Sequence, residues 1–330
     1  MIIPPKFTLT SSMLQTFATI EANKYILATR DVQTLFVENI QRKSLLKSSL
    51  FSAQIEGNTL TLSEAEQLSE KNVYDKGKRE VTNLMRALSF LRKTPVVSFF
   101  DQDFILRLHN IAMDGLIERE RRGKLRKEPS AIFNEAGFAV YVTPSPSQIP
   151  LLLEDLIHYI NGTSEKNIPI KAIVSHYIFE KIHPFLDGNG RVGRLLIQAI
   201  LATGGYHFNW LLSFEEILNE RKIEYYSYLD QNDVTPFVEF MLEVLMSASE
   251  NSIKLVDNQK EYNKEDSLLP RRKEILLLIR EQQLLSFDRI RRRFLIIPER
   301  TLRYDLLQLQ KGGFIMKLGT TKGVLYKTKQ

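Results

Sequence analysis

The chain contains no cysteine, so disulfides and thiolate metal sites are both excluded. Nowhere is there an apolar run of about 18 residues that would span a bilayer, and residues 1–6 lack the hydrophobic stretch of a secretion signal. No internal repeats or low-complexity tracts are evident. These absences lead us to expect a cytoplasmic protein with no membrane contact. Four scattered histidines have no second histidine or cysteine beside them, so we interpret them as structural or surface residues: His109, His158, His176 and His207.

A chain of 330 residues, 43% hydrophobic and 25% charged, is long enough for two or three soluble domains. Its net charge of +6 is unevenly distributed. From Ser267 onward there are fifteen Lys and Arg against five Asp and Glu, a net charge of +10, which leaves −4 for residues 1–266. This asymmetry indicates a nucleic-acid or anionic-surface module at the C-terminal end.

The stretch from His183 to Arg194 concentrates groups that suit phosphate chemistry. A Gly-Asn-Gly turn that opens a helix can cradle an anion, because backbone N–H groups converge there and the helix end is partly positive. Asp187 is a hard oxygen ligand suited to Mg²⁺, and His183 can accept a proton near neutral pH. The alternative is a glycine-rich helix start with a structural histidine. The joint pattern, with arginines at two set offsets, favours chemistry on a nucleotide phosphate.

Hydrophobic periodicity predicts a mainly α fold. Helices are expected over residues 32–55, 104–115, 149–161, 168–182, 191–203, 214–230 and 234–249, with further helix between 64 and 98. Residues 131–142 are predicted to form a β-hairpin that serves as a flap. Glu56 lies near a helix end, before a Gly-Asn pair that can cap the helix. Taken alone, a glutamate at such a place is usually only solvated.

The predicted domains are a helical region over 1–99, a catalytic core over 100–249, a linker over 250–269 and a basic domain over 270–330. In the last, three helices and a terminal hairpin are typical of a winged helix-turn-helix. Its third helix would then present Arg300, Thr301 and Arg303 to the major groove, and Lys322 at the hairpin tip would reach phosphates. Use of the same fold for protein contacts is the alternative.

The twelve residues from 183 to 194 resemble, without a departure, the signature of the Fic-domain family, His-Pro-Phe-x-Asp/Glu-Gly-Asn-Gly-Arg-x-x-Arg. The resemblance extends over roughly residues 100–245, flap included. It implies an enzyme that transfers AMP from ATP, with Mg²⁺, to a hydroxyl side chain of a protein.

Carried over to this chain, the resemblance makes His183 the general base that deprotonates the target Tyr, Thr or Ser. Asp187 would hold Mg²⁺, and Phe185 would pack inward to fix the loop. Arg191 would contact the phosphates and Arg194 would hold the γ-phosphate. The anion hole would be formed by Gly188, Asn189 and Gly190.

Residues 52–57, Ser-Ala-Gln-Ile-Glu-Gly, are similar to the inhibitory motif that many Fic proteins carry N-terminal to the core. In that motif the glutamate pairs with the second arginine of the signature and blocks the γ-phosphate position. The resemblance thus implies that Glu56 pairs with Arg194, and a carboxylate–guanidinium pair is specific enough to compete with phosphate.

The sequence therefore predicts an autoinhibited protein adenylyltransferase joined to a DNA-binding domain. Two alternatives stay open: an enzyme that removes AMP through the same site, and a transcription regulator whose Fic core senses nucleotide. The modified protein, the DNA site, the oligomeric state (a homo-oligomer included) and the signal that relieves inhibition are not identified by the sequence.

Overall fold

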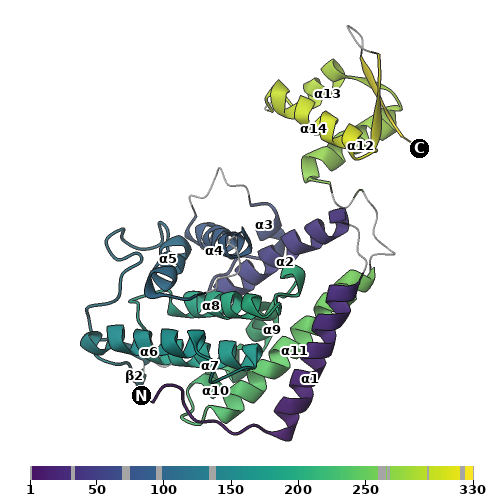
Figure 1. Cartoon of the computed structure of the whole chain (residues 1–330). Helices are drawn as coiled ribbons and strands as arrows, with labels where there is room; N and C mark the ends of the chain where they lie inside the picture. Colours follow the sequence, from purple (N-terminus) through teal and green to yellow (C-terminus); the bar gives the residue numbers. More distant parts are fainter. Residues whose placement is uncertain are drawn as a thin grey trace. The chain divides into compact units, whose positions relative to one another are not determined.

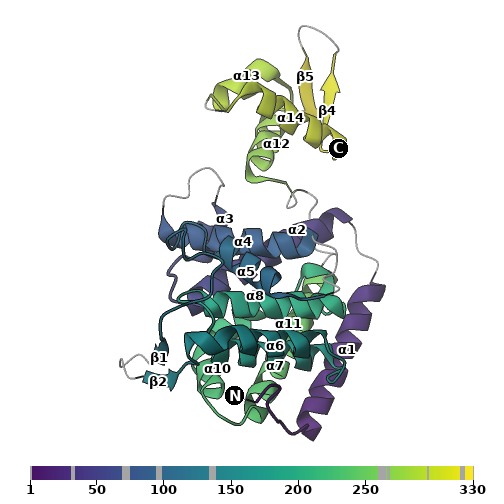
Figure 2. The ribbon, with the colours of Figure 1, turned by 60° about the vertical axis from the view of Figure 1, so that its left-hand side comes forward.

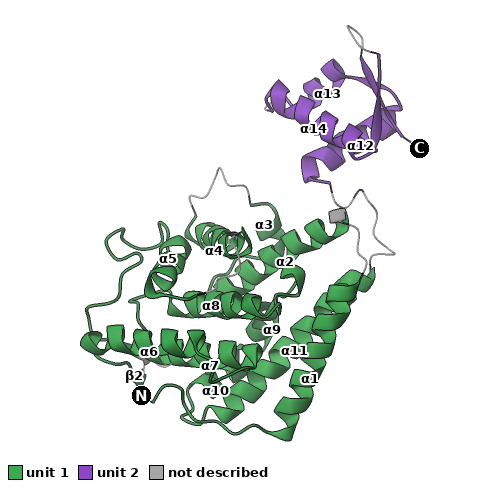
Figure 3. Cartoon of the chain, in the orientation of Figure 1, with its two compact units in different colours: residues 1–258 green, residues 259–330 purple. Residues whose placement is uncertain are grey.

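The computed structural model describes residues 2–30, 34–68, 75–93, 99–133, 139–258, 265, 268–295, 297–319 and 324–329. The chain divides into two compact units, residues 1–258 and residues 259–330 (Figure 3). Helices dominate both units and the strands are few and short. The predicted mainly α fold with small β elements is confirmed. Within the described ranges, no helix combines the length and apolar character needed to cross a bilayer.

The first unit is a helical bundle with one short hairpin (Figure 1). Its elements are α1 (Ser11–Thr29), α2 (Thr34–Ile55), α3 (Leu62–Glu66), α4 (Lys76–Lys93), α5 (Gln102–Ala112), β1 (Ala131–Phe133), β2 (Ala139–Val142), η1 (Pro146–Gln148), α6 (Ile149–Asn161), α7 (Ile168–Ile182), α8 (Asn189–Thr203), η2 (Phe208–Trp210), α9 (Phe214–Glu220), α10 (Lys222–Leu229) and α11 (Thr235–Asp257).

Helices α7 and α8 form the centre of this unit, with other helices on every side (Figures 1 and 2). Nearly every residue of both helices is buried, which explains why α7 is apolar all round rather than on one stripe. The two helices approach closely at Gly193, where a Cβ atom would lie 2.4 Å from Glu180 Oε1 and 2.7 Å from His176 Nδ1. The buried pair gives a rigid base for the loop between them, residues 183–188.

The outer helices bring remote parts of the chain together. Helix α1 lies along α11, where the Asn23 amide donates a buried hydrogen bond of 2.8 Å to Ser249 Oγ (Figure 1). Helix α2 packs on α4 and α9, and Ser48 Oγ donates a 2.6 Å bond to Glu215 Oε2. As a result, the C-terminal end of α2 with Glu56 is carried to α8, although the two are more than a hundred residues apart.

Two predicted helices differ in extent. The helix expected over 214–230 is broken at Arg221 into α9 and α10, with no proline or glycine to mark the break. Helix α11 continues past residue 249 to Asp257, so the first part of the expected linker is helical. Strands β1 and β2 pair antiparallel, with Ala131 opposite Val142. The turn of the predicted hairpin lies outside the described residues.

The described residues of the second unit form three helices and a small antiparallel sheet of order β3–β5–β4. Its elements are α12 (Pro270–Gln282), β3 (Leu285–Ser286), α13 (Phe287–Arg293), α14 (Glu299–Lys311), β4 (Ile315–Leu318) and β5 (Leu325–Thr328). Ser286 caps α13 by accepting a bond from Arg289 N. Apolar side chains of all three helices and the sheet form one core, centred on Ile279, Leu302 and Leu306.

Candidate active site

The loop between α7 and α8 is shaped by two residues with positive φ. His183 ends α7 in the left-handed conformation (φ 51°, ψ 58°), while its N–H donates to Phe179 O at 2.9 Å. Gly188 has φ 88°, and a Cβ there would lie 2.6 Å from Met113 Sδ. Because a side chain at Gly188 would meet both backbone strain and Met113, this position favours glycine.

A buried network holds the loop closed. The Asn189 side chain accepts a bond from Phe185 N at 2.9 Å and donates one to Phe185 O at 2.8 Å. Phe185 is fully buried and its ring stacks on His109, with centroids 3.8 Å apart. The Asn189 side-chain amide is therefore engaged in fixing the turn.

His109 also reaches the signature loop directly. Its Nε2 lies 3.0 Å from Asp187 O, and its Nδ1 accepts a 2.8 Å bond from Gly123 N. Burial lowers the pKa of His109 to about 4, so the ring is neutral at physiological pH. Because Nδ1 is an acceptor, Nε2 carries the hydrogen and donates a hydrogen bond to the Asp187 carbonyl. His109 has the structural role that was predicted, now with specific partners.

Arg126 anchors the same loop from outside the signature. Its Nε donates to His183 O at 2.7 Å, and its backbone N–H donates to Pro184 O at 2.9 Å. Its Nη2 donates to Thr143 Oγ1 at 2.9 Å and Pro144 O at 2.7 Å. Thr143 and Pro144 directly follow strand β2. Arg126 thereby links the loop that carries His183, the candidate general base, to the residues that directly follow the hairpin.

His183 itself is half-buried at the C-terminal end of α7. Burial, reinforced by the charge of Arg126, lowers the pKa of His183 below its ordinary value, although the backbone carbonyl of Glu180 opposes this. A lowered pKa keeps the imidazole unprotonated near neutral pH. That is the form required of a general base.

Arg194 is the most voluminous of the fully buried side chains in the described structure, at 1% exposure. Its Nη2 donates to Glu56 Oε1 at 2.9 Å and to Ser52 O at 2.8 Å, and its Nε donates to Ser52 Oγ at 2.9 Å. A Cβ at Gly190 would lie 2.3 Å from Glu56 Oε1. The carboxylate therefore lies directly against the Gly-Asn-Gly turn, where the absence of a side chain leaves room for it.

Arg191 is held by two further carboxylates. Its Nη2 donates to Asp187 Oδ1 and its Nη1 to Glu80 Oε1, both at 2.5 Å. Glu80, on α4, is 9% exposed and also accepts a 2.8 Å bond from Asn58 Nδ2. Both arginines of the signature are thus ion-paired within the protein. Glu80 was not singled out from the sequence, where it reads as an ordinary acidic residue of an amphipathic helix.

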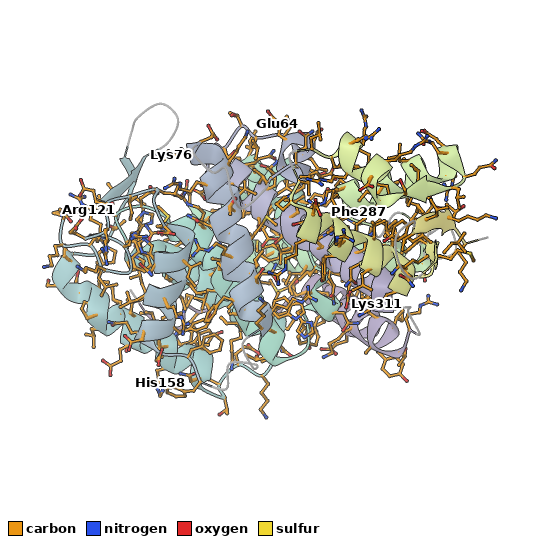
Figure 4. The ribbon with its side chains drawn as sticks, turned by 90° about the horizontal axis from the view of Figure 1, so that it is seen from above. Glu64, Lys76, Arg121, His158, Phe287 and Lys311 are labelled. Carbon is orange, nitrogen blue, oxygen red and sulfur yellow. The ribbon has the colours of Figure 1, made fainter. Side chains whose placement is uncertain are left out.

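A polar cleft of about 700 Å³ opens beside this cluster. Figure 4 labels Glu64 on α3 and Lys76 at the start of α4, two residues of its wall. Other residues that line the cleft include Glu56, Asn58, Glu80, Asp187 and Arg191. The cleft is large enough for a small ligand, and its wall contains residues of the signature and of the segment around Glu56.

The structure therefore brings most of the predicted site together: the signature residues from His183 to Arg194 and, from the turn after α2, Glu56. Arg126, Glu80, Asn58 and the loop contact of His109 were missed. In the second unit, Arg300 is exposed and Thr301 half-buried on α14. The Arg303 guanidinium lies 3.9 Å from the centroid of the Phe287 ring and 3.8 Å from Glu299 Oε2. Figure 4 labels Phe287 at the start of α13. Lys322 lies outside the described residues.

Known proteins resemble this chain in sequence and in fold. Residues 99–201 match the Fic/DOC family. Among curated relatives, "Protein adenylyltransferase Fic" of Drosophila mojavensis is 27% identical over 203 residues, which are 58% of this chain and 38% of the relative. Its namesake of Nematostella vectensis is 30% identical over 225 residues, 62% of this chain and 48% of the relative.

Solved structures share the fold. A Fic family protein from Desulfovibrio desulfuricans G20 has a TM-score of 0.67 at 24% identity and covers 98% of both chains. Fic-1 from C. elegans has a TM-score of 0.61 at 20% identity, covering 74% of this chain and 73% of the other. The chain spans about two fifths of the length of the first curated relatives. Residues 99–201 are a Fic/DOC domain, as the signature predicted.

Proposed function

We propose that this protein transfers AMP from ATP to a hydroxyl group of a protein side chain, its own included, and that Glu56 inhibits the transfer. The observation that carries the proposal is the arrangement at the start of α8. There His183, the candidate base with a lowered pKa, lies five residues before the glycine turn. Glu56 lies against Gly190 and is paired with Arg194, the arginine that would otherwise bind phosphate. The match to proteins named as adenylyltransferases supports the same reaction.

In this reaction, the hydroxyl oxygen of the target attacks the α-phosphorus, and the bond from that phosphorus to the β-phosphate oxygen breaks. Pyrophosphate leaves and AMP stays on the target. His183 accepts the hydroxyl proton, for which its unprotonated ring is suited. The N–H groups at the start of α8, with Arg191 and Arg194, would offset the charge on the phosphates.

The site has donors that suit Mg²⁺. Asp187 lines the cleft with a side chain that is 53% exposed, and one of its oxygens bonds Arg191. Mg²⁺ in nucleotide sites is often held by one or two carboxylates together with substrate phosphates, and it neutralises phosphate charge. Among the described residues no group of three or more His, Asp or Glu could hold a metal ion, so the nucleotide would supply further ligands. Asp187 is the residue we assign to Mg²⁺.

The test is labelling with ATP that carries its label in the α-phosphate. Wild type, Glu56→Gly and the double variant Glu56→Gly, His183→Ala are each incubated with Mg²⁺ and lysate. We expect weak labelling of proteins by wild type, strong labelling by Glu56→Gly and none by the double variant. Labelling that persists without His183 would contradict the assigned base, and no labelling by any variant would contradict the transfer. Loss of label from an already modified target would indicate that the same site removes AMP.

For the second unit we propose duplex DNA as the partner, through a winged helix-turn-helix. The C-terminal net charge of +10 and the exposed arginines of α13 and α14 favour this partner. Arg300 has no salt bridge among the described residues, whereas Arg303 is engaged by Phe287 and Glu299. We therefore expect Arg300→Ala to weaken DNA binding more than Arg303→Ala does.

The measurement is DNA affinity over a range of salt concentrations. Arg280→Ala is a suitable control, because Arg280 is paired with Glu265 on another part of the unit. Loss of Arg300 should lower the affinity and reduce the salt dependence, as the loss of a phosphate contact does. Affinity that is independent of salt, or equal in all variants, would leave only a nucleotide-responsive or protein-binding role for this unit.

A further inference from the structure

The turn that carries Glu56 is tied down at a second point. Helix α2 ends at Ile55, and three backbone bonds close the turn: Glu56 N to Ala53 O at 3.0 Å, Gly57 N to Gln54 O at 3.0 Å and Asn58 N to Ala53 O at 3.1 Å. Glu56 and Asn58 therefore move together. The Glu56 carboxylate faces Arg194, and the Asn58 side chain faces α4.

Asn58 uses its whole amide. Its Nδ2 donates to Glu80 Oε2 at 2.8 Å and to Gly77 O at 3.0 Å, and its Oδ1 accepts from Leu60 N at 2.9 Å. The turn is thereby fixed to the first turns of α4. The strongest of these contacts is expected to be the one with Glu80, because its acceptor is a carboxylate.

Glu80 is oriented from both sides. One of its oxygens accepts from Asn58 and the other from Arg191 Nη1, and the residue is 9% exposed. A carboxylate with a separate donor on each oxygen has little freedom to rotate. Glu80 thus connects the turn of Glu56 with the signature helix at a point distinct from the Glu56–Arg194 pair.

We propose that Asn58 and Glu80 form a latch that holds Glu56 over Arg194 and so determines the strength of inhibition. The proposal rests on the proposed function. Glu56 leaves Arg194 most readily if its turn moves away from α8, and the bond between Asn58 and Glu80 opposes that movement. A phosphate that draws Arg191 away from Glu80 removes one of the two donors that orient this carboxylate, and so favours release of the turn.

The test compares three variants. Two change the side-chain amide of Asn58, and the third removes a similar amide elsewhere as a control. Asn58→Ala removes the latch, and Asn58→Asp places a carboxylate against Glu80. The matched control is Asn219→Ala, because Asn219 Nδ2 donates at 3.2 Å to Gln54 Oε1, on α2 one turn before the latch. Each is prepared with Glu56 present and with Glu56→Gly, and its folding is checked by thermal unfolding.

With Glu56 present, we expect Asn58→Ala to raise AMP transfer about tenfold or more, because Asn58 loses its bond to the charged Glu80 together with those to Gly77 O and Leu60 N. Asn58→Asp should raise it further, because two like charges then face each other. Asn219→Ala should leave the rate unchanged. In the Glu56→Gly background, none of the three should raise the rate, because there is no inhibitor left to release.

Three outcomes overturn the latch: no increase for Asn58→Ala, the same increase for Asn219→Ala, or the same increase once Glu56 is gone. If Glu56→Gly transfers no AMP at all, the proposed function fails. The latch is then tested by the ATP affinity of the same Asn58 and Asn219 variants, with and without Glu56, measured by calorimetry. It should rise on substitution of Asn58 only when Glu56 is present, and an unchanged affinity would refute the latch.

Discussion

Arg126→Ala is the substitution that should most clearly separate positioning of the base from nucleotide binding. The Arg126 side chain donates four hydrogen bonds, to His183 O, Thr143 Oγ1, Pro144 O and Glu128 O, at 2.7 to 2.9 Å. Alanine leaves all four acceptors without this donor. Arg126 is not among the residues of the cleft wall, so we expect the cleft to keep its shape in the variant.

A hydrogen bond to a charged group contributes about 1.5–3 kcal/mol, and bonds of one network are not additive. Water can replace part of the network at the exposed end of the loop. We therefore expect a loss of about 3–5 kcal/mol in the free energy of unfolding, at the upper end for single substitutions. For a unit of this size each kcal/mol lowers the Tm by about 2–4 °C, so a drop of roughly 6–20 °C is expected. Arg126→Lys keeps the charge but has only a single donor group. It should therefore recover less than half of the free energy of unfolding that is lost in Arg126→Ala.

The assay is AMP transfer in the Glu56→Gly background, below the Tm of each variant. Since His183 loses its backbone anchor, kcat should fall at least tenfold while the KM for ATP stays within a factor of about two. Calorimetric unfolding gives the stability of the same proteins. An unchanged Tm, or a raised KM with kcat preserved, would refute the assignment of Arg126 as the positioning residue of the base.

Two further predictions concern the buried surroundings of α8. Gly188→Ala places a non-glycine residue at φ 88° and its Cβ 2.6 Å from Met113 Sδ, so the free energy of unfolding should fall by about 1–3 kcal/mol. Adding Met113→Ala relieves the contact but not the backbone strain. Full recovery of stability in that double variant would contradict the presence of backbone strain. Burial first, and then the charge of Glu56, raise the pKa of Glu180 from 4.5 to about 8, against the opposing charge of Arg194. Protonated Glu180 is favoured in the folded state, so its contribution to stability is present below pH 4.5 and is lost as the pH rises to about 8. Glu180→Gln should therefore gain Tm relative to wild type between pH 5 and 8, and a constant difference would show that Glu180 does not titrate there.

The local features of the site could be predicted from the sequence because they depend on residues that are adjacent in the chain. The apolar run of α7 with the glycines of the signature gives two buried helices and a tight loop, and its bounds 168–182 are those observed. The break at Arg221 was missed, because nothing in the local sequence opposes a continuous helix from 214 to 230.

The pairing of the arginines depends on contacts that are remote in sequence. Arg194 and Glu56 are 138 residues apart, and their pairing was expected only through a resemblance. Arg191 and Glu80 are 111 residues apart, and a glutamate on the polar face of an amphipathic helix gives no sign of its partner. The same holds for Arg126, whose neighbours are other basic and acidic residues. Only the tertiary packing of the chain identifies these groups as part of the site.

Competition between Glu56 and the terminal phosphate of ATP for Arg194 is tested most directly by the ratio of ATP to ADP affinity. The ratio is measured by calorimetry in wild type and in Glu56→Gln, which keeps the shape of the side chain and removes its charge. Loss of a charge-assisted bond to a buried arginine should raise ATP affinity about tenfold or more, with little effect on ADP, which lacks the third phosphate. The ratio should rise accordingly. An equal ratio in the two proteins would contradict competition between Glu56 and the terminal phosphate for Arg194.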